Sequence, residues 1–300
     1  MQDVAVATTP KKRPRPRIKQ LEVMVAEVRR EAAETATLVL FTGNDSLDYK
    51  PGHFLTIKPH QFSALDRFIH FFEDRKGKKE PARAYSIASA PHEKYLSITV
   101  KEERYISGKT EYPPLLSPIL VWRTEPGTRM VVTGFGGPYT LADDVEDRTD
   151  HLVHICAGSG VVPNMSIIKH ALREHPRLRH TLLCGNKRRS DVIYRDELDE
   201  LARRHPDRLI LVDALSREGD LGAFGPRYVA GRVTEELIRR HVPEPDAAEF
   251  YVCGPGVTKW DRAAAAREGR EPQPRFLEST LAALEAMGVA KDSIHHESYG

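Results

Sequence analysis

The sequence is poor in cysteine, and this limits the kinds of site it can carry. Its 300 residues include only Cys156, Cys184 and Cys253, which are widely spaced and form no C-x-x-C pair. We therefore expect no disulfide framework, and a cytoplasmic protein. An iron–sulfur cluster normally needs four closely spaced cysteine ligands, so the chain should hold no cluster of its own. We expect no metal site.

Long apolar runs and a dominant charge are also missing. The longest strongly apolar run, residues 115–122, is interrupted by Ser117 and Pro118 and is too short to cross a bilayer. The 45 basic and 43 acidic residues leave a net charge of +2, which predicts neither nucleic-acid nor membrane binding. The basic, proline-rich residues 1–19 lack the apolar segment of a secretion signal, and we expect a disordered tail.

The remaining chain shows two different sequence patterns. Residues 20–148 read as short strands separated by Gly, Pro and Asp turns, which is typical of a small antiparallel barrel. Residues 149–300 alternate apolar strands with amphipathic helices, which is typical of a doubly wound parallel sheet. We therefore expect a two-domain protein, an antiparallel β-barrel followed by an α/β domain.

The first chemistry-bearing motif is the segment 81–89, Pro-Ala-Arg-Ala-Tyr-Ser-Ile-Ala-Ser. On a strand, Arg83 and Tyr85 project to one face and Ser86 to the other. A cation, a ring and a hydroxyl suit a ligand with a diphosphate, a flat ring system and a hydrogen-bonding edge, and FAD is such a ligand. Downstream, Ser117 followed by Pro118 predicts a serine-capped helix start, which would attract phosphate.

A second motif, residues 156–166, joins a buried strand to a helix expected over 164–173. Gly158 and Gly160 free the backbone between them, so that N–H groups and the helix dipole can face a pyrophosphate. Pro163 replaces the third glycine of the usual dinucleotide fingerprint. A tight loop without a ligand is the alternative interpretation.

A third motif, Tyr-Val-Cys-Gly-Pro-Gly, occupies residues 251–256 at the end of another expected strand. Together the three motifs resemble those of the ferredoxin–NADP reductase family, which has Arg-x-Tyr-Ser, Gly-x-Gly-x-x-Pro and Cys-Gly-Pro in this order. The stretch 185–198, with Gly-Asn and then Tyr-Arg-Asp-Glu-Leu, and the terminal Glu-Ser-Tyr at 297–299 resemble further family motifs.

The resemblance implies an FAD-dependent NADPH reductase that passes electrons through the flavin to a separate ferredoxin, or to an oxygenase or desaturase component. In its terms Ser86, Cys253, Glu297 and Tyr299 act where hydride is transferred, and Ser216 with Arg217 holds the 2′-phosphate of NADPH. The full set of implied cofactor-binding residues is Arg83, Ala84, Tyr85, Ser86, Val100, Ser117, Gly158, Ser159, Gly160, Pro163, Asn186, Lys187, Arg188, Ser216, Arg217, Cys253, Gly254 and Pro255.

Three stretches depart from the family pattern: residues 61–80, 108–116 and 257–275. In the first, Phe68 and Phe72 belong to a set of apolar residues at helical spacing. Each stretch is either local packing or a docking surface for an electron acceptor. Two other functions stay open, an electron-relay subunit without independent turnover and a redox sensor with bound flavin.

Overall fold

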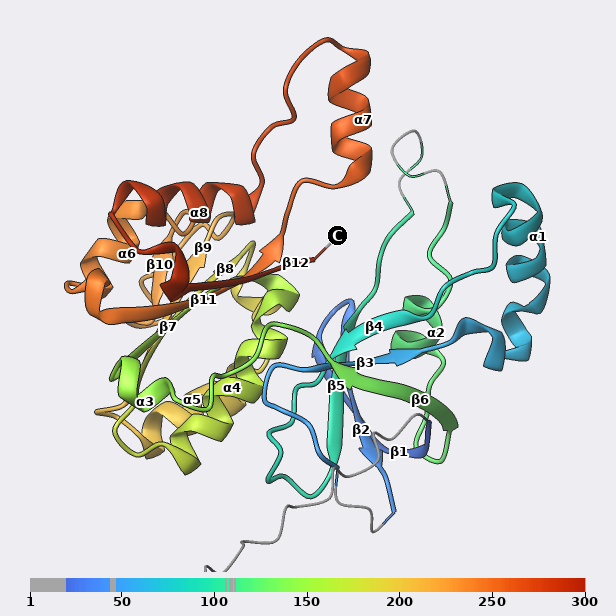
Figure 1. The fold of residues 1–300 in the computed structure, drawn as a ribbon, viewed down its shortest axis with the longest axis horizontal. Coiled ribbons are helices and arrows are strands. Elements are labelled where there is room, and N and C mark those ends of the chain that lie inside the picture. Colours follow the sequence, from blue (N-terminus) through green and yellow to red (C-terminus); the bar gives the residue numbers. More distant parts are fainter. Residues whose placement is uncertain (1–19, 44–46, 106, 108–109, 111, 300) are drawn as a thin grey trace, which may run out of the picture.

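The computed structural model describes residues 20–43, 47–105, 107, 110 and 112–299, so the tail expected at residues 1–19 lies outside the described residues. Two six-stranded sheets lie side by side (Figure 1), one antiparallel and one parallel. The expected two-part architecture is confirmed. In the part of the chain described, no helix is both long and apolar enough to span a membrane.

The antiparallel sheet has the strand order β4-β3-β6-β1-β2-β5. A bridge between Ile87 and Ile98 joins its two edges, which gives the sheet its barrel form. Apolar side chains such as Leu38, Leu55 and Ile98 fill the interior and are completely buried. The strands are β1 (Leu21–Ala32), β2 (Thr35–Phe41), β3 (Phe54–Ile57), β4 (Arg83–Ser86), β5 (Leu96–Lys101) and β6 (Arg129–Gly136).

Two helices accompany the barrel, α1 (Asp66–Lys76) and α2 (Ser117–Trp122). The helix start at Ser117 is confirmed, but the expected serine cap is wrong. Leu116 occupies the capping position, and Ser117 Oγ instead accepts a hydrogen bond from the Glu103 N–H at 3.1 Å. The hydroxyl is used to fix the preceding loop.

The parallel sheet has the order β10-β9-β8-β7-β11-β12. Chain order reverses direction between β7 and β11, which is the topological switch point where such sheets bind ligands. The strands are β7 (His151–Ala157), β8 (Arg179–Asn186), β9 (Leu209–Leu215), β10 (Tyr228–Ala230), β11 (Ala248–Pro255) and β12 (Ile294–Tyr299).

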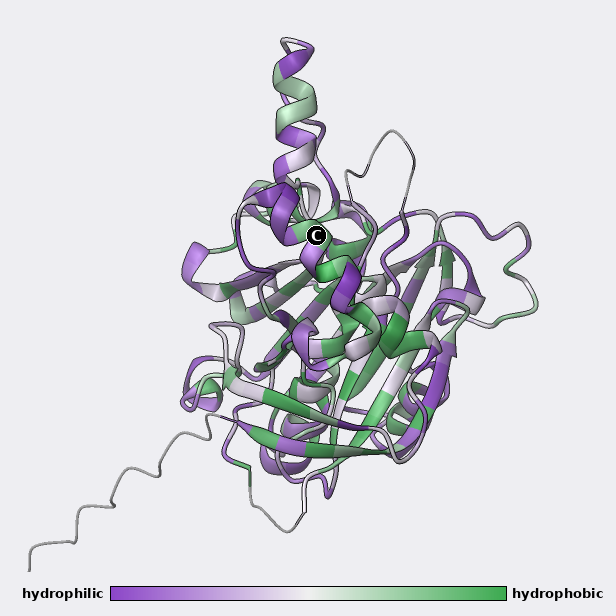
Figure 2. Ribbon diagram, turned by 90° about the vertical axis from the view of Figure 1, so that its right-hand side faces the viewer, coloured by the Kyte–Doolittle hydropathy of each residue, from purple (hydrophilic) through white to green (hydrophobic). Residues whose placement is uncertain are grey.

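Helices cover both faces of the parallel sheet (Figure 1). Its strands are largely apolar and buried between them (Figure 2), as a parallel sheet requires. Helix α7 (Lys259–Arg267) projects from this half as an arm. One face carries α3 (Val145–Arg148), α4 (Val161–Glu174) and α5 (Arg195–Arg204), and the other α6 (Glu235–His241) and α8 (Phe276–Ala286). The division expected at residue 148 stays a prediction.

Candidate cofactor site between the two sheets

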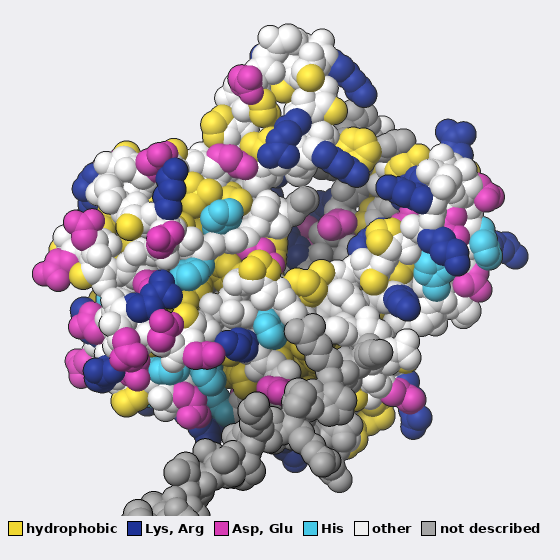
Figure 3. All heavy atoms as spheres, in the orientation of Figure 1, with side chains coloured by type: hydrophobic (Ala, Val, Ile, Leu, Met, Phe, Trp, Pro, Cys, Tyr) yellow, Lys and Arg dark blue, Asp and Glu magenta, His cyan; other side chains and the backbone are white. Residues whose placement is uncertain are grey.

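A cavity of about 940 Å³ lies between the antiparallel and parallel halves. The space-filling view shows the opening below the arm that carries α7 (Figure 3). Residues from the ends of β4, β5, β7, β8 and β12 line it, so both sheets contribute walls. Of the residues expected at a cofactor or at the reaction site, those lining the cavity are Ala84, Tyr85, Ser86, Val100, Gly158, Ser159, Asn186, Lys187, Ser216, Pro255, Glu297 and Tyr299.

One wall joins the barrel to the last strand of the parallel sheet. The Tyr299 hydroxyl donates a hydrogen bond to Ser86 Oγ at 2.5 Å. Glu297 stands on the same strand, and its Oε2 is buried without a hydrogen-bond partner among the described residues. Burial raises the pKa of Glu297, while a hydrogen bond with Ser86 opposes the rise. This wall therefore presents an aromatic ring and a carboxyl group with spare hydrogen-bonding capacity.

The glycine loop forms the floor at the switch point. Strand β7 ends at Ala157, a single 3-10 turn covers Gly158–Gly160, and α4 begins at once at Val161. A Cβ atom at Gly160 would lie 2.0 Å from the carbonyl oxygen of Cys253, so only glycine fits without displacing a backbone. The close approach brings the ends of β7 and β11 together at the start of α4.

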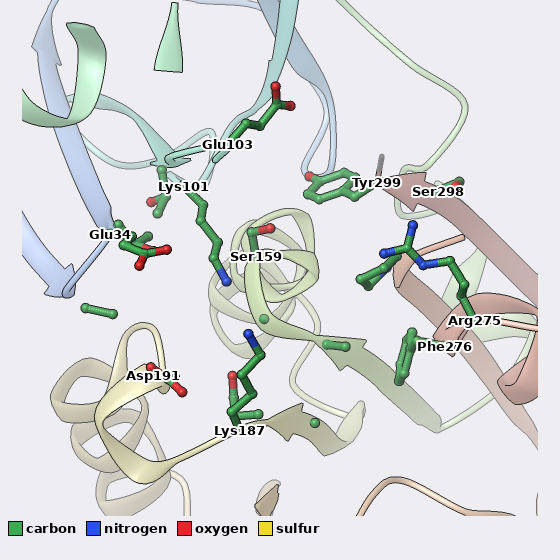
Figure 4. Close-up of a pocket in the computed structure, with 18 of the residues that line it drawn as sticks. Glu34, Lys101, Glu103, Ser159, Lys187, Asp191, Arg275, Phe276, Ser298 and Tyr299 are labelled. Atoms are coloured by element: carbon green, nitrogen blue, oxygen red, sulfur yellow. The ribbon is translucent and has the colours of Figure 1, made fainter. Parts of the chain in front are cut away.

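Two lysines provide positive charge over this floor. Lys101 and Lys187 extend toward one another near Ser159 (Figure 4). Burial lowers the pKa of Lys101, and the charge of Lys187 lowers it further. Arg232 and Arg275 also line the cavity. The arrangement suits a negatively charged group such as a pyrophosphate. The sequence motifs pointed to Lys187 but not to Lys101, whose only signal is its place after Val100 at the end of a strand.

Arg83 lies outside the cavity lining. Its guanidinium donates to Glu80 Oε2 at 2.8 Å and to the Pro81 carbonyl at 2.6 Å. The Glu80 side chain is almost fully buried and also pairs with Lys76. Burial alone would raise the pKa of Glu80, but the hydrogen bonds from Lys76 and Arg83 hold it below its ordinary value. Glu80 thus fixes the orientation of Arg83.

Cys253 also lies behind the cavity wall rather than in it. It is completely buried, and the Tyr299 ring packs against the cluster that contains it. In the pairing of β11 with β12, Cys253 is opposite Glu297. Burial raises the pKa of the Cys253 thiol, and the nearby Glu297 charge raises it further, so the thiol stays neutral.

The remaining expected residues take supporting positions. Gly160 ends the 3-10 turn, Pro163 lies in the first turn of α4, and Gly254 lies near the end of β11. Ser117 starts α2. Ser216 and Arg217 follow β9; their N–H groups donate to the carbonyls of Asn186 and Lys187. In the described part of the chain, the exposed Arg217 guanidinium has no ion-pair partner. Arg188 lies before the 3-10 turn at 189–191.

Residues 61–80, the first departure from the family pattern, contain helix α1, as the helical spacing of their apolar residues predicts. Phe72 is 2% exposed and Ile69 likewise 2%, so Phe72 belongs to the barrel core and not to an exposed patch. Phe68 and Phe71 are instead 55% and 56% exposed. Trp260 on α7, in the third departure, is 51% exposed. The second departure lies partly outside the described residues.

Comparison with known proteins finds relatives of one kind. Residues 154–259 match the family model of the oxidoreductase NAD-binding domain. The ferredoxin reductase component of 3-ketosteroid-9-alpha-monooxygenase from Mycolicibacterium smegmatis is 30% identical over 292 residues, covering 93% of this chain and 65% of that protein. A ferredoxin–NADP reductase from Thermosynechococcus vestitus is 28% identical over 69% of this chain and 58% of its own length.

A human NADH-cytochrome b5 reductase 2 is 36% identical over 39% of this chain and 42% of its own length. The chain spans about half the length of the curated relatives it matches. Among solved structures, the flavohem-like FAD/NAD binding domain of a nitric oxide dioxygenase from Vibrio cholerae has the same fold, with a TM-score of 0.68. It is 21% identical and covers 94% of this chain and 99% of its own.

Proposed function

Because this chain belongs to the ferredoxin reductase family of flavin oxidoreductases, we propose that it is an FAD-dependent NADPH reductase. Its electron acceptor would be a separate ferredoxin, or the iron–sulfur protein of an oxygenase or desaturase. One observation carries the proposal: a single cavity joins the Tyr85–Ser86 segment of the barrel to the glycine loop of the parallel sheet.

The residues of the cavity fit these cofactors. Glu297 Oε2 is a buried acceptor without a partner among the described residues, and it stands beside the Ser86 hydroxyl on the wall that a flavin ring would cover. The backbone at Gly160 leaves no room for a side chain, which suits a pyrophosphate approaching the start of α4. Lys101 and Lys187 supply the positive charge for that anion.

When bound, the flavin supplies hydride acceptance from the nicotinamide and the release of single electrons. The chain supplies alignment. Ser86 and Glu297 present a hydroxyl and a carboxyl at one wall, and burial raises the pKa of Glu297. Tyr299 packs against the buried cluster that contains Cys253, so Tyr299 and not the thiol faces the cavity.

NADPH rather than NADH is proposed from the residues after β9. Ser216 lines the cavity and is followed by the exposed Arg217, and Lys187 and Arg232 also line the cavity. These groups suit a dianionic phosphate. Relatives named for NADH and for NADP both occur, so their names do not distinguish the two nucleotides.

The test is direct. Purified protein should be yellow, release FAD on denaturation, and reduce an artificial acceptor with NADPH under steady-state conditions. Bound FAD that NADPH reduces, with no steady-state acceptor turnover, would favour the electron-relay or sensor function. Protein that binds no flavin when reconstituted with FAD would contradict the proposal.

A further inference from the structure

One residue outside the cavity lining connects the two halves in an unusual way. Tyr194 precedes α5 in the parallel half and is buried. Its φ of 59° makes it the one non-glycine residue with positive φ among those described. A tyrosine in this conformation is strained where glycine would not be, and such strain persists only where surrounding contacts hold it.

The hydrogen bonds of the Tyr194 N–H and hydroxyl both run to the barrel. Its N–H donates to Glu31 Oε2 at 3.1 Å, and its hydroxyl forms a short hydrogen bond with Thr99 Oγ1. Thr99 Oγ1 in turn lies 2.7 Å from Thr37 Oγ1, which donates to Glu31 Oε1 at 2.7 Å. The four residues therefore close a ring of hydrogen bonds across the domain contact.

The direction of these bonds follows from the acceptor at the end. Thr37 donates its one hydroxyl proton to Glu31, so Thr99 donates to Thr37 and the Tyr194 phenol donates to Thr99. The Tyr194 phenol is therefore the first donor in this series of hydrogen bonds. Removing it leaves the Tyr194 ring without its polar attachment to the barrel.

This ring of hydrogen bonds includes a residue of β5, one of the strands that line the cofactor cavity. Thr99 itself lines the cavity and is followed on β5 by Val100 and Lys101, which also line it. Tyr194 follows β8, which ends with Asn186 at the opposite wall. The connection thus runs between two walls that face each other across the cavity.

We infer that Tyr194 is a positioning residue that fixes the nucleotide-binding wall against β5 and so sets the alignment of nicotinamide and flavin. The expected effect on the rate of flavin reduction rests on the proposed function. The contact itself can be tested without cofactor.

The central variant is Tyr194→Phe, which removes one oxygen. In stopped-flow experiments we expect flavin reduction by NADPH to slow by about 10- to 100-fold, with nucleotide Kd within about 3-fold of wild type, because misalignment of about 1 Å is that costly. The long-wavelength charge-transfer absorbance of the bound nucleotide should weaken. Thr99→Val should slow flavin reduction to the same extent, whereas Thr99→Ser keeps the hydroxyl and should have the wild-type rate. The double variant Tyr194→Phe with Thr99→Val should be no slower than either single variant.

Hydrogen exchange of the apoprotein gives the cofactor-independent measurement. Peptides around residues 96–101 and 192–197 should exchange faster in Tyr194→Phe, with an unchanged melting temperature. Tyr251→Phe is the matched control, since the aromatic contacts of this buried tyrosine of the same half are, among the described residues, with Tyr139, His154 and His295. Unchanged exchange in both Tyr194→Phe and Thr99→Val would overturn the inference. Faster exchange in the two variants, together with a wild-type protein whose flavin NADPH does not reduce, would support the contact and contradict the proposed function alone.

Discussion

The Arg83 guanidinium and the Glu80 carboxylate form an ion pair at 2.8 Å in which the acid is buried and the base is partly exposed. Glu80 therefore holds the Arg83 side chain in a fixed orientation at the start of β4. The guanidinium retains N–H groups for a second acceptor, because only two of them are used by Glu80 and Pro81.

Replacing Arg83 with Ala should weaken FAD binding. Loss of a charge-assisted contact worth roughly 1.5–3 kcal/mol corresponds to about 10- to 150-fold in affinity. Flavin titration of the apoprotein measures this, with Arg129→Ala, an exposed arginine of β6 paired to Glu22, as the control. Equal affinity in both variants would leave Arg83 with a purely structural role beside Glu80.

Gly160→Ala should impair nucleotide binding. The added methyl would lie 2.0 Å from the Cys253 carbonyl oxygen, so the loop or the end of β11 must shift. We expect destabilisation of about 1–3 kcal/mol and weaker NADPH binding with the flavin retained. Gly219→Ala is the control, because no atom lies within 4 Å of its new methyl. Calorimetric titration with NADP⁺ is the measurement, and matching affinities in the two variants would refute this reading of the loop.

Arg217→Ala should reduce the preference for NADPH. Two polar contacts to the 2′-phosphate, each roughly 1.5–3 kcal/mol before screening, predict on the order of 100-fold preference in wild type. The specificity constants kcat/KM for NADPH and NADH measure it. Arg239→Ala, on α6 and paired to Glu235, controls for net charge. Equal constants in wild type would remove the basis for the claim.

The exposed aromatics of α1 should affect the protein acceptor selectively. Phe68→Ser with Phe71→Ser should raise the KM for the iron–sulfur acceptor and leave reduction of a small artificial acceptor unchanged. Phe72→Ser is the contrasting variant, since this core side chain should cost about 3–5 kcal/mol of stability. If the surface pair lowers both activities equally, α1 does not serve as a docking surface.

Buried histidines should make the protein sensitive to mild acid. Burial lowers the pKa of His154 to about 4, although a hydrogen bond with Asn164 opposes the shift. Between pH 6.5 and pH 4 the unfolded chain binds more protons than the folded one, so stability falls as the pH falls through this range. The loss in the free energy of unfolding that comes from His154 over this range is on the order of 3 kcal/mol.

Urea unfolding at pH 7, 6 and 5 measures this dependence. His154→Gln should show a weaker dependence on pH than wild type, and the exposed His296→Gln should match wild type. A His154→Gln protein with an unaltered pH dependence would assign the effect to other groups.

The sequence was most informative where backbone geometry limits the residue type. The glycine loop, the strand before it and the helices at 235–241 and 276–286 could be located, since glycine spacing and apolar periodicity are local signals. Helix α4 begins three residues before the expected Asn164, because the 3-10 turn of Gly158–Gly160 continues directly into it.

The contacts between side chains were harder to predict from the sequence. The Arg83–Glu80 pair, the burial of Phe72 and the placement of Lys101 depend on how distant segments meet, and periodicity says nothing of that. Tyr194 belonged to a recognised stretch, yet its contacts with Glu31 and Thr99 join residues 163 and 95 positions away. Such pairs have no local signature.

The bond between Tyr299 and Ser86 joins residues 213 positions apart. During synthesis the barrel segment is made long before β12 exists, so an emerging chain has strand β4 without the wall that β12 completes. Tight retention of a flavin should therefore be a late event in folding, after β12 has paired with β11. The barrel half made alone, as residues 20–148, would lack that wall and lose its ligand readily on dilution.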